Sequence, residues 1–440
     1  MNATLLLLIA GAIGLVILGT AVLKWHPALV LLVVSLLLGG AAGLGVADTL
    51  AAVNTGFGSL LGSIGWLVVL GALLGVLLQD SGAAARVAER LLRGFGAQHP
   101  ERALGAVGAL VSIPVFCDSG FILLAGLARA VGRRTRHAAG ATAPLALAGG
   151  LYTTHTLVPP TPGPVAALGN LGAVEAIGQL MLLGLLVSLP VLLVVMLWSR
   201  RVGARLHLAP LAAEPAAPPD RMLPAFGRAV LPLLLPILLI AAGTAGKLSG
   251  FYPAWLRLLG NPLIALLLGF VAAVILLRGH VQHGLEALIK RGVSIAGPIL
   301  IITGAGGALG GVLKALPLRA QIEALTGADQ LSGTAAILLA FGLAALLKTA
   351  QGSSTNALVI TSALLAPLVV SMSATQLAIL ALATGGGAMT VSHANDSFFW
   401  VVTEFSGLSV RDALRSFSVL TALQGTIVLL SCLGLWQLLA

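Results

Sequence analysis

Long apolar runs separated by short polar stretches follow one another along the whole chain. Each run has about 20 residues, which is the length that a helix needs to cross the hydrocarbon core of a bilayer. The pattern predicts uninterrupted spans at residues 4–23, 28–46, 57–79, 176–198, 226–247, 255–278, 294–316 and 416–438. We therefore expect an all-α polytopic membrane protein.

Four further apolar segments are interrupted near their middle by polar residues, glycine or proline. Their ranges are 104–128, 138–170, 331–372 and 376–403. Broken backbone inside a membrane is tolerated where it lines a polar cavity within the protein. Basic residues flank 104–128 on both sides, so this segment is predicted to enter and leave by one face, as a re-entrant hairpin. We interpret 331–372 as its counterpart and the other two segments as broken helices.

The densest group of polar residues in an apolar segment lies between Thr390 and Trp400. Three glycines precede it, and the group itself comprises Ser392, His393, Asn395, Asp396 and Ser397. An aspartate at the centre of a membrane helix costs about 3 kcal/mol on insertion scales, so such residues are rare unless they are used. This stretch is predicted to form one wall of a solute-binding site.

The order of spans and interruptions repeats in the two halves of the chain. Residues 1–198 and residues 226–440 each have about five spanning segments, one of them broken, and one hairpin. Asp118 and Pro160 are separated by as many residues as Ser353 and Asn395. Repeated halves with paired interruptions are typical of secondary transporters whose site lies where the repeats meet. The Arg-, Ala- and Pro-rich stretch 199–225 between the halves is predicted to be a solvated linker.

Composition and charge agree with the membrane assignment and add an orientation. Of the 440 residues, 58% are hydrophobic and only 9% are charged, whereas soluble domains have about 25% charged residues. The net charge of +10 comes from basic residues confined to a few loops, which is an orientation signal rather than a nucleic-acid surface. With the N-terminus outside, most of the 24 Lys and Arg residues fall on the cytoplasmic side.

This orientation has consequences for the whole topology. It places both termini outside and the 199–225 linker in the cytoplasm. It also makes the two halves inverted repeats, with hairpins that enter from opposite faces and have tips near the midplane. The first span has no basic leader, so we interpret it as a retained helix.

The chain offers little for catalysis or for a cofactor. Its two cysteines, Cys117 and Cys432, suggest neither a disulfide framework nor a zinc site. The glycine run 304–311 lacks the G-x-G-x-x-G spacing of a dinucleotide loop and is better suited to close helix packing. His155, His393 and two aspartates could do acid–base chemistry, but no activated nucleophile accompanies them. We expect no enzyme, no cofactor and no bound metal.

The motifs within the interrupted segments resemble those of the gluconate permease (GntP) family. The residues that carry the resemblance, which covers nearly the whole chain, are His155–Pro164, Gly304–Gly307, Gln351–Ser353 and Ser392–Trp400. The resemblance implies proton-coupled uptake of gluconate or a related small hydroxy or sugar acid across the bacterial inner membrane. It also implies two hairpins, two broken helices, homodimers and elevator-like motion.

A sugar-acid anion needs hydroxyl and amide partners and a source of positive charge, which helix N-termini at broken segments supply in part. The substrate-binding candidates are Asp118, Ser119, Thr161, Gly163, Lys348, Gln351, Ser353, Ser354, Thr355, Asn356, Ser392, His393 and Asn395. Each also has a structural alternative. The proline-rich break can be purely mechanical, the hairpin tips can be caps, and Lys348 can pair with a membrane acid instead of the substrate carboxylate.

Proton coupling requires a group that titrates within the membrane segments. We place it on Asp396, with Asp118 and His155 as alternatives, because buried carboxylates and imidazoles exchange protons near neutral pH when their surroundings change. Asp396 as a helix cap and the histidines as partners of backbone carbonyls are the structural alternatives. Sodium coupling through the hydroxyls of Ser353 and Ser392 remains open, and so, with less support, does a channel.

Overall fold

The computed structural model describes residues 3–95, 99–133, 140–206, 208, 223–316 and 333–439. Within these ranges every regular element is a helix, so the all-α prediction is confirmed. Six helical stretches of the described chain are long and apolar enough to cross a membrane. They are Val46–Asp80, Val174–Gly203, Phe226–Ser249, Leu285–Ala315, Gly333–Gln351 and Val410–Leu439. The chain is therefore a polytopic helical membrane protein.

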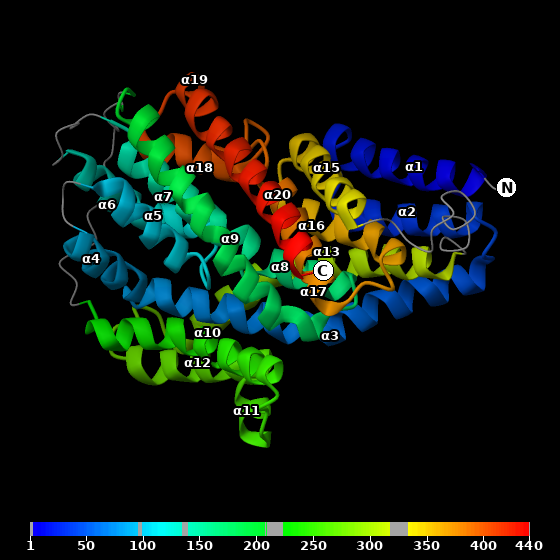
Figure 1. Cartoon of the computed structure of the whole chain (residues 1–440), viewed down its shortest axis with the longest axis horizontal. Helices are drawn as coiled ribbons and strands as arrows, with labels where there is room; N and C mark the ends of the chain where they lie inside the picture. Colours follow the sequence, from blue (N-terminus) through cyan, green and yellow to red (C-terminus); the bar gives the residue numbers. More distant parts are fainter. Residues whose placement is uncertain are drawn as a thin grey trace.

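Two long helices, α3 (Val46–Asp80) and α13 (Leu285–Ala315), pack along each other and form the spine of the molecule. Figure 1 shows α3 running along much of the long axis, with α1 (Ala3–Ile17) and α2 (Pro27–Ala41) above its N-terminal half. The two long helices approach closely where Gly56 faces Gly307, because a Cβ on either glycine would overlap the backbone of the other. The glycine run of α13 therefore serves helix packing.

Both spine helices begin earlier than their hydrophobic runs predict, by about two to three turns. The added turns of α3 include Asp48 and Asn54, and those of α13 include Glu286 and Lys290. No proline or cap interrupts these polar turns, so the helices continue through them. A hydrophobicity criterion finds the part of a helix that lies in lipid and misses its polar extension.

Each interrupted segment of the sequence consists of two helices with a break between them. The pairs are α5 (Pro100–Val111) with α6 (Cys117–Arg133), α7 (Thr142–Leu157) with α8 (Pro162–Asn170), α15 (Gly333–Gln351) with α16 (Ser354–Leu365), and α17 (Ala374–Met389) with α18 (Ser397–Ser406). The basic stretch before α5 is also helical, as α4 (Ala83–Phe95), because its apolar residues face inward and bury Val87 and Ala88.

The helices of the two halves make matching contacts. Helix α5 packs on α7 as α15 packs on α17, and α6 packs on α18 as α16 packs on α8. Helix α7 also contacts α9 (Ile177–Trp198), as α17 contacts α20 (Val419–Leu439). This pairing is what two equivalent repeats would produce. Their inversion across a membrane stays a prediction, and most of the 199–225 linker lies outside the described residues.

The remaining helices of the second half lie against the spine. Helix α10 (Phe226–Ser249) packs on α12 (Pro262–Leu277), and α12 packs on α3. The predicted span 255–278 is divided into α11 (Ala254–Leu259) and α12, because Asn261 caps a new helix that starts at Pro262. In Figure 1 these three helices form the lower edge of the molecule. A last short helix, α19 (Val410–Ala413), precedes α20.

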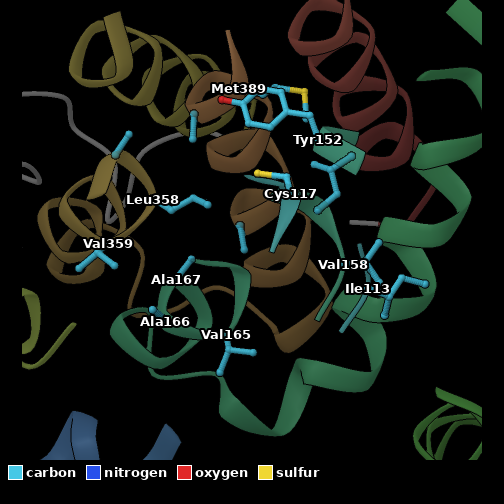
Figure 2. Close-up of a cluster of buried hydrophobic side chains, with 14 of the residues drawn as sticks. Ile113, Cys117, Tyr152, Val158, Val165, Ala166, Ala167, Leu358, Val359 and Met389 are labelled. Carbon is cyan, nitrogen blue, oxygen red and sulfur yellow. The ribbon is translucent and has the colours of Figure 1, made fainter. Parts of the chain in front are cut away.

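An apolar cluster surrounds the place where the broken segments meet. Figure 2 shows Tyr152 of α7, Val165 of α8, Leu358 of α16 and Met389 of α17 within it, and all four are buried. Among helices in lipid, such close contacts hold elements together by dispersion rather than by exclusion of water. The breaks are thus supported on one side by a packed, rigid core.

The orientation inferred from the basic residues can be tested with single cysteines in two described loops. Gly279 lies in the α12–α13 loop with open space around it, and Val370, before α17, is exposed. We predict that Gly279→Cys reacts with an impermeant thiol reagent only in permeabilised cells, whereas Val370→Cys reacts in intact cells. The native cysteines are both buried and provide the background. Labelling of position 279 in intact cells would contradict the orientation.

Candidate functional site

A cavity of about 240 Å³ lies where the breaks of three interrupted segments meet helix α7. Its walls come from α6, α7, the α15–α16 tip and the break before α18. The lining residues are Cys117, Asp118, Tyr152, His155, Gln351, Gly352, Ser353, Ser354, Thr355, Asn395, Asp396, Ser397 and Phe398. Almost all of them carry polar groups, although the surrounding helices are apolar.

Three helices begin at the wall of this cavity. Helix α6 starts at Cys117, α16 at Ser354 and α18 at Ser397. Side chains define two of these starts, because Ser353 Oγ accepts the N–H of Asn356 at 3.3 Å and Asp396 Oδ1 accepts the N–H of Phe398 at 3.1 Å. A helix N-terminus carries partial positive charge, so three of them together favour an anionic ligand.

A buried ion pair joins the hairpin to the broken helix behind the cavity wall. Lys348 Nζ lies 2.5 Å from Asp396 Oδ2, and the two side chains are 0% and 5% exposed. The ammonium also donates to the carbonyl of Gly352 at 2.6 Å and lies 5.6 Å from the centre of the Tyr152 ring. Lys348 was predicted to pair either with the substrate carboxylate or with a membrane acid, and in the structure it pairs with a membrane acid.

The rest of the break before α18 is held by hydrogen bonds to backbone groups. His393 Nε2 and Asn395 Nδ2 both lie within hydrogen-bonding distance of the carbonyl of Thr349, at 3.1 Å and 2.7 Å. The hydroxyl of Ser392 donates to Asp396, and its backbone N–H donates to Thr421 Oγ1. These contacts give the Thr349 carbonyl, in the last turn of α15, its hydrogen-bond partners, and they hold Asp396 and Asn395 at the cavity.

Five buried polar atoms of cavity residues have no hydrogen-bond partner within the described part of the chain. They are Asp118 Oδ1, His155 Nδ1, Gln351 Oε1, Gln351 Nε2 and Asn395 Oδ1. A buried polar group without a partner costs about 1–3 kcal/mol, so a folded protein does not collect several at one place without use. The cavity presents acceptors and donors that a polyhydroxylated or amide-like ligand can satisfy.

The structure brings about half of the predicted site residues to the cavity. Those that line it are Asp118, His155, Gln351, Ser353, Ser354, Thr355, Asn395 and Asp396. Lys348 lies behind the wall. Ser119, Thr161, Gly163, Asn356, Ser392 and His393 do not line it.

The contacts of the proline-rich break favour a purely mechanical role over contact with a ligand. Thr161 Oγ1 donates to the carbonyl of Val158 at 2.6 Å, inside the turn itself. Gly163 packs against Leu358, and a Cβ at that position would come within 2.7 Å of the Leu358 side chain. The break therefore ends α7 beside the cavity and lets α8 pack on α16, without adding a wall to the cavity.

The lining also includes Cys117, Tyr152, Gly352, Ser397 and Phe398, which the sequence did not single out as binding residues. Ser397 and Phe398 lie in the stretch that was predicted to form a wall of the site, whereas Cys117, Tyr152 and Gly352 were missed. Tyr152 was detectable, because it is one of only two tyrosines and lies one helical turn before His155. Its hydroxyl is 2.9 Å from Ser354 Oγ, which links α7 to the hairpin tip. A buried tyrosine hydroxyl normally has such a partner.

Comparison with known proteins adds independent evidence. A family model described as GntP family permease matches residues 3–439. The chain is 32% identical to a gluconate permease of Pseudomonas aeruginosa, over 93% of this chain and 92% of the relative. It is 33% identical to the inner membrane permease YgbN of Escherichia coli, over 96% and 97%. It is 30% identical to the D-serine transporter DsdX of Escherichia coli, over 95% of each chain.

A solved structure is similar in fold. The YdaH transporter of Alcanivorax borkumensis superposes with a TM-score of 0.57, covers 90% of each chain and is 17% identical in sequence. At that identity the likeness concerns the fold alone.

Proposed function

We infer that this chain, which belongs to the GntP family of permeases, imports gluconate or a related small hydroxy or sugar acid together with a proton. The relatives are named permeases or transporters, and the expectation that the protein is no enzyme is confirmed. We propose the identity of the substrate, the coupled ion and the direction of transport.

One observation supports this proposal most strongly: polar atoms that have no hydrogen-bond partner in the described residues share one cavity with three helix N-termini. A sugar acid has a carboxylate that suits the helix N-termini and several hydroxyls that can both donate and accept. Gln351 and Asn395 offer matching amide groups, and Ser353 and Thr355 offer hydroxyls. A purely apolar solute would leave the amide of Gln351 and the Oδ1 atom of Asn395 without partners.

The proposal includes a location and a movement. We place the chain in the bacterial inner membrane with both termini outside, as a homodimer. The broken segments and hairpins would move together against the spine of α3 and α13, which pack along each other and contact the moving part through α8 and α16. A carrier, unlike a channel, accumulates its substrate against a gradient with saturable kinetics. Uptake that persists after sodium is replaced by choline would support proton coupling over sodium coupling.

A binding screen tests the substrate class. We predict that gluconate or another small hydroxy acid raises the melting temperature of the purified protein, because a ligand that binds only the folded state stabilises it by mass action. At a ligand concentration of one hundred times Kd the gain is about 2.7 kcal/mol. The panel includes sugar acids, short hydroxy acids, D- and L-serine, and neutral sugars as controls. Stabilisation by neutral sugars alone would contradict an acid-binding site.

Substitutions in the cavity test the location of the site. Asn395→Ala and Ser353→Ala are each expected to weaken binding about tenfold, the equivalent of one hydrogen bond to a charged or polar ligand. Ser353 also caps α16, so its control is Ser373→Ala, which removes the cap of α17 away from the cavity. Unchanged affinity in both folded cavity variants would place the site elsewhere.

A further inference from the structure

The two carboxylates of the cavity have opposite surroundings. Asp396 is fully occupied: it pairs with Lys348, accepts the hydroxyl of Ser392 and caps α18 through the N–H of Phe398. Both of its carboxylate oxygens have partners, and the Lys348 ammonium lies 2.5 Å from one of them. Asp396 is therefore suited to hold the hairpin and the broken helix together.

Asp118 has almost no partners of its own. Its Oδ1 atom is buried without a hydrogen-bond partner in the described chain, and the contacts of its side chain are a long one of 3.9 Å from Cys117 Sγ to Oδ2 and one with its own backbone N–H. It lies at the start of α6 and faces the cavity. The titratable and charged groups around it are Cys117, Tyr152, His155, Lys348 and Asp396, while α4 and α5 contribute none to the cavity.

The charges of the cavity do not balance when both carboxylates are ionised. Lys348 is the one cation near the cavity in the described chain, and Asp396 already holds it. No Lys or Arg is among the described lining residues. Asp118 therefore has no ion-pair partner in the described chain, and a substrate carboxylate entering the same cavity would be repelled by its charge at short range.

We propose that Asp118 is the group that binds the coupled proton, and that its protonation is the condition for anion binding. This assignment rests on the proposed function, and it replaces the choice of Asp396 that the sequence favoured. A proton from the outer solution joins the Asp118 carboxylate and makes a neutral acid. The repulsion disappears, and the new O–H becomes a donor for the substrate. When substrate leaves to the cytoplasm, the proton follows it.

The pH dependence of affinity tests this assignment directly. If one proton is taken up per bound anion, the Kd of a hydroxy acid rises about tenfold per pH unit above the titration of Asp118. We expect this slope in the wild type, its loss in Asp118→Asn, and its return in Asp118→Glu. Isothermal titration with gluconate between about pH 5 and 8 measures it, and melting curves show that each variant is folded.

A matched control and a second measurement exclude indirect effects. Asp48→Asn removes an exposed carboxylate in the first turn of α3 and is expected to keep the wild-type slope. In weakly buffered solution, gluconate added to wild-type protein should withdraw about one proton per bound anion, as the same linkage requires, and Asp118→Asn should withdraw none. In proteoliposomes this variant should exchange substrate without accumulating it from a pH gradient.

The outcomes separate this assignment from the proposed function. If the wild type binds acids with no pH dependence, or if a folded Asp118→Asn keeps the full slope, the assignment is wrong while the transport function stands. Tight, pH-independent binding of a zwitterion such as D-serine would also overturn it, because Asp118 would then pair with the ammonium. Failure of the wild type to bind any acid would contradict the proposed function and the assignment with it.

Discussion

Replacing Lys348 with methionine is expected to lower the free energy of unfolding by about 3–5 kcal/mol and to abolish transport. The ammonium is fully buried and is the counter-charge of Asp396, so its removal leaves an ionised carboxylate inside the protein without a cation. It also removes the donor to the carbonyl of Gly352, which ties the end of α15 to the hairpin tip. Denaturation of the purified protein in mixed micelles measures the loss of stability, and uptake in proteoliposomes measures transport.

Two further variants show whether the cause is the unpaired charge. Lys348→Met combined with Asp396→Asn removes both charges and should recover a large part of the lost stability. Lys314→Met removes an exposed lysine near the end of α13 and should change stability by less than about 0.5 kcal/mol. If the single Lys348 variant is as stable as the wild type, the ion pair does not hold the two segments together.

The second large effect is expected at Gly352, the residue between α15 and α16. Its φ of +83° lies in the left-handed region, which costs other residues about 1–2 kcal/mol. A Cβ there would also overlap the carbonyl group of Asn395, and overpacking of this kind adds about 1–3 kcal/mol. We therefore expect Gly352→Ala to push the hairpin tip away from the broken helix and to lose most substrate binding and transport.

Gly342→Ala is the control for this substitution. Gly342 lies in the same helix α15 with open space around its Cβ position, so alanine there should be neutral or stabilise by about 0.5–1 kcal/mol. Binding affinity and melting temperature, measured for both variants, distinguish a local steric effect from general sensitivity of the hairpin. Normal affinity in Gly352→Ala would mean that close contact of tip and broken helix is not needed for the site.

The helical class and the positions of the breaks were accessible from the sequence, for a physical reason. Apolar runs of span length and prolines or polar clusters within them are local signals. The gaps between α7 and α8 and between α15 and α16 fall on the runs Pro159–Pro164 and Gln351–Asn356. The helix extensions before residues 57 and 294 carried no apolar signal and were missed.

The partners of the site residues were not accessible in the same way. Both Asp396 and Asp118 are acids in apolar segments, and no local pattern shows that Lys348 reaches one and not the other. The same holds for Tyr152 and Ser354, which come from different halves of the chain and meet only because α7 packs beside the hairpin tip. Which polar atoms are satisfied is a property of the three-dimensional arrangement, and here it decides between the two carboxylates.

A cryo-EM map of the purified protein, saturated with the acid that stabilises it most, shows whether this cavity is the substrate site. We predict ligand density in the cavity between α7, the hairpin tip and the break before α18, within hydrogen-bonding distance of Asp118, Gln351 and Asn395. A second cavity of about 420 Å³ lies between α3 and α13, beside Lys314. Density in that cavity, with none beside Asp118 and Asn395, would contradict the account.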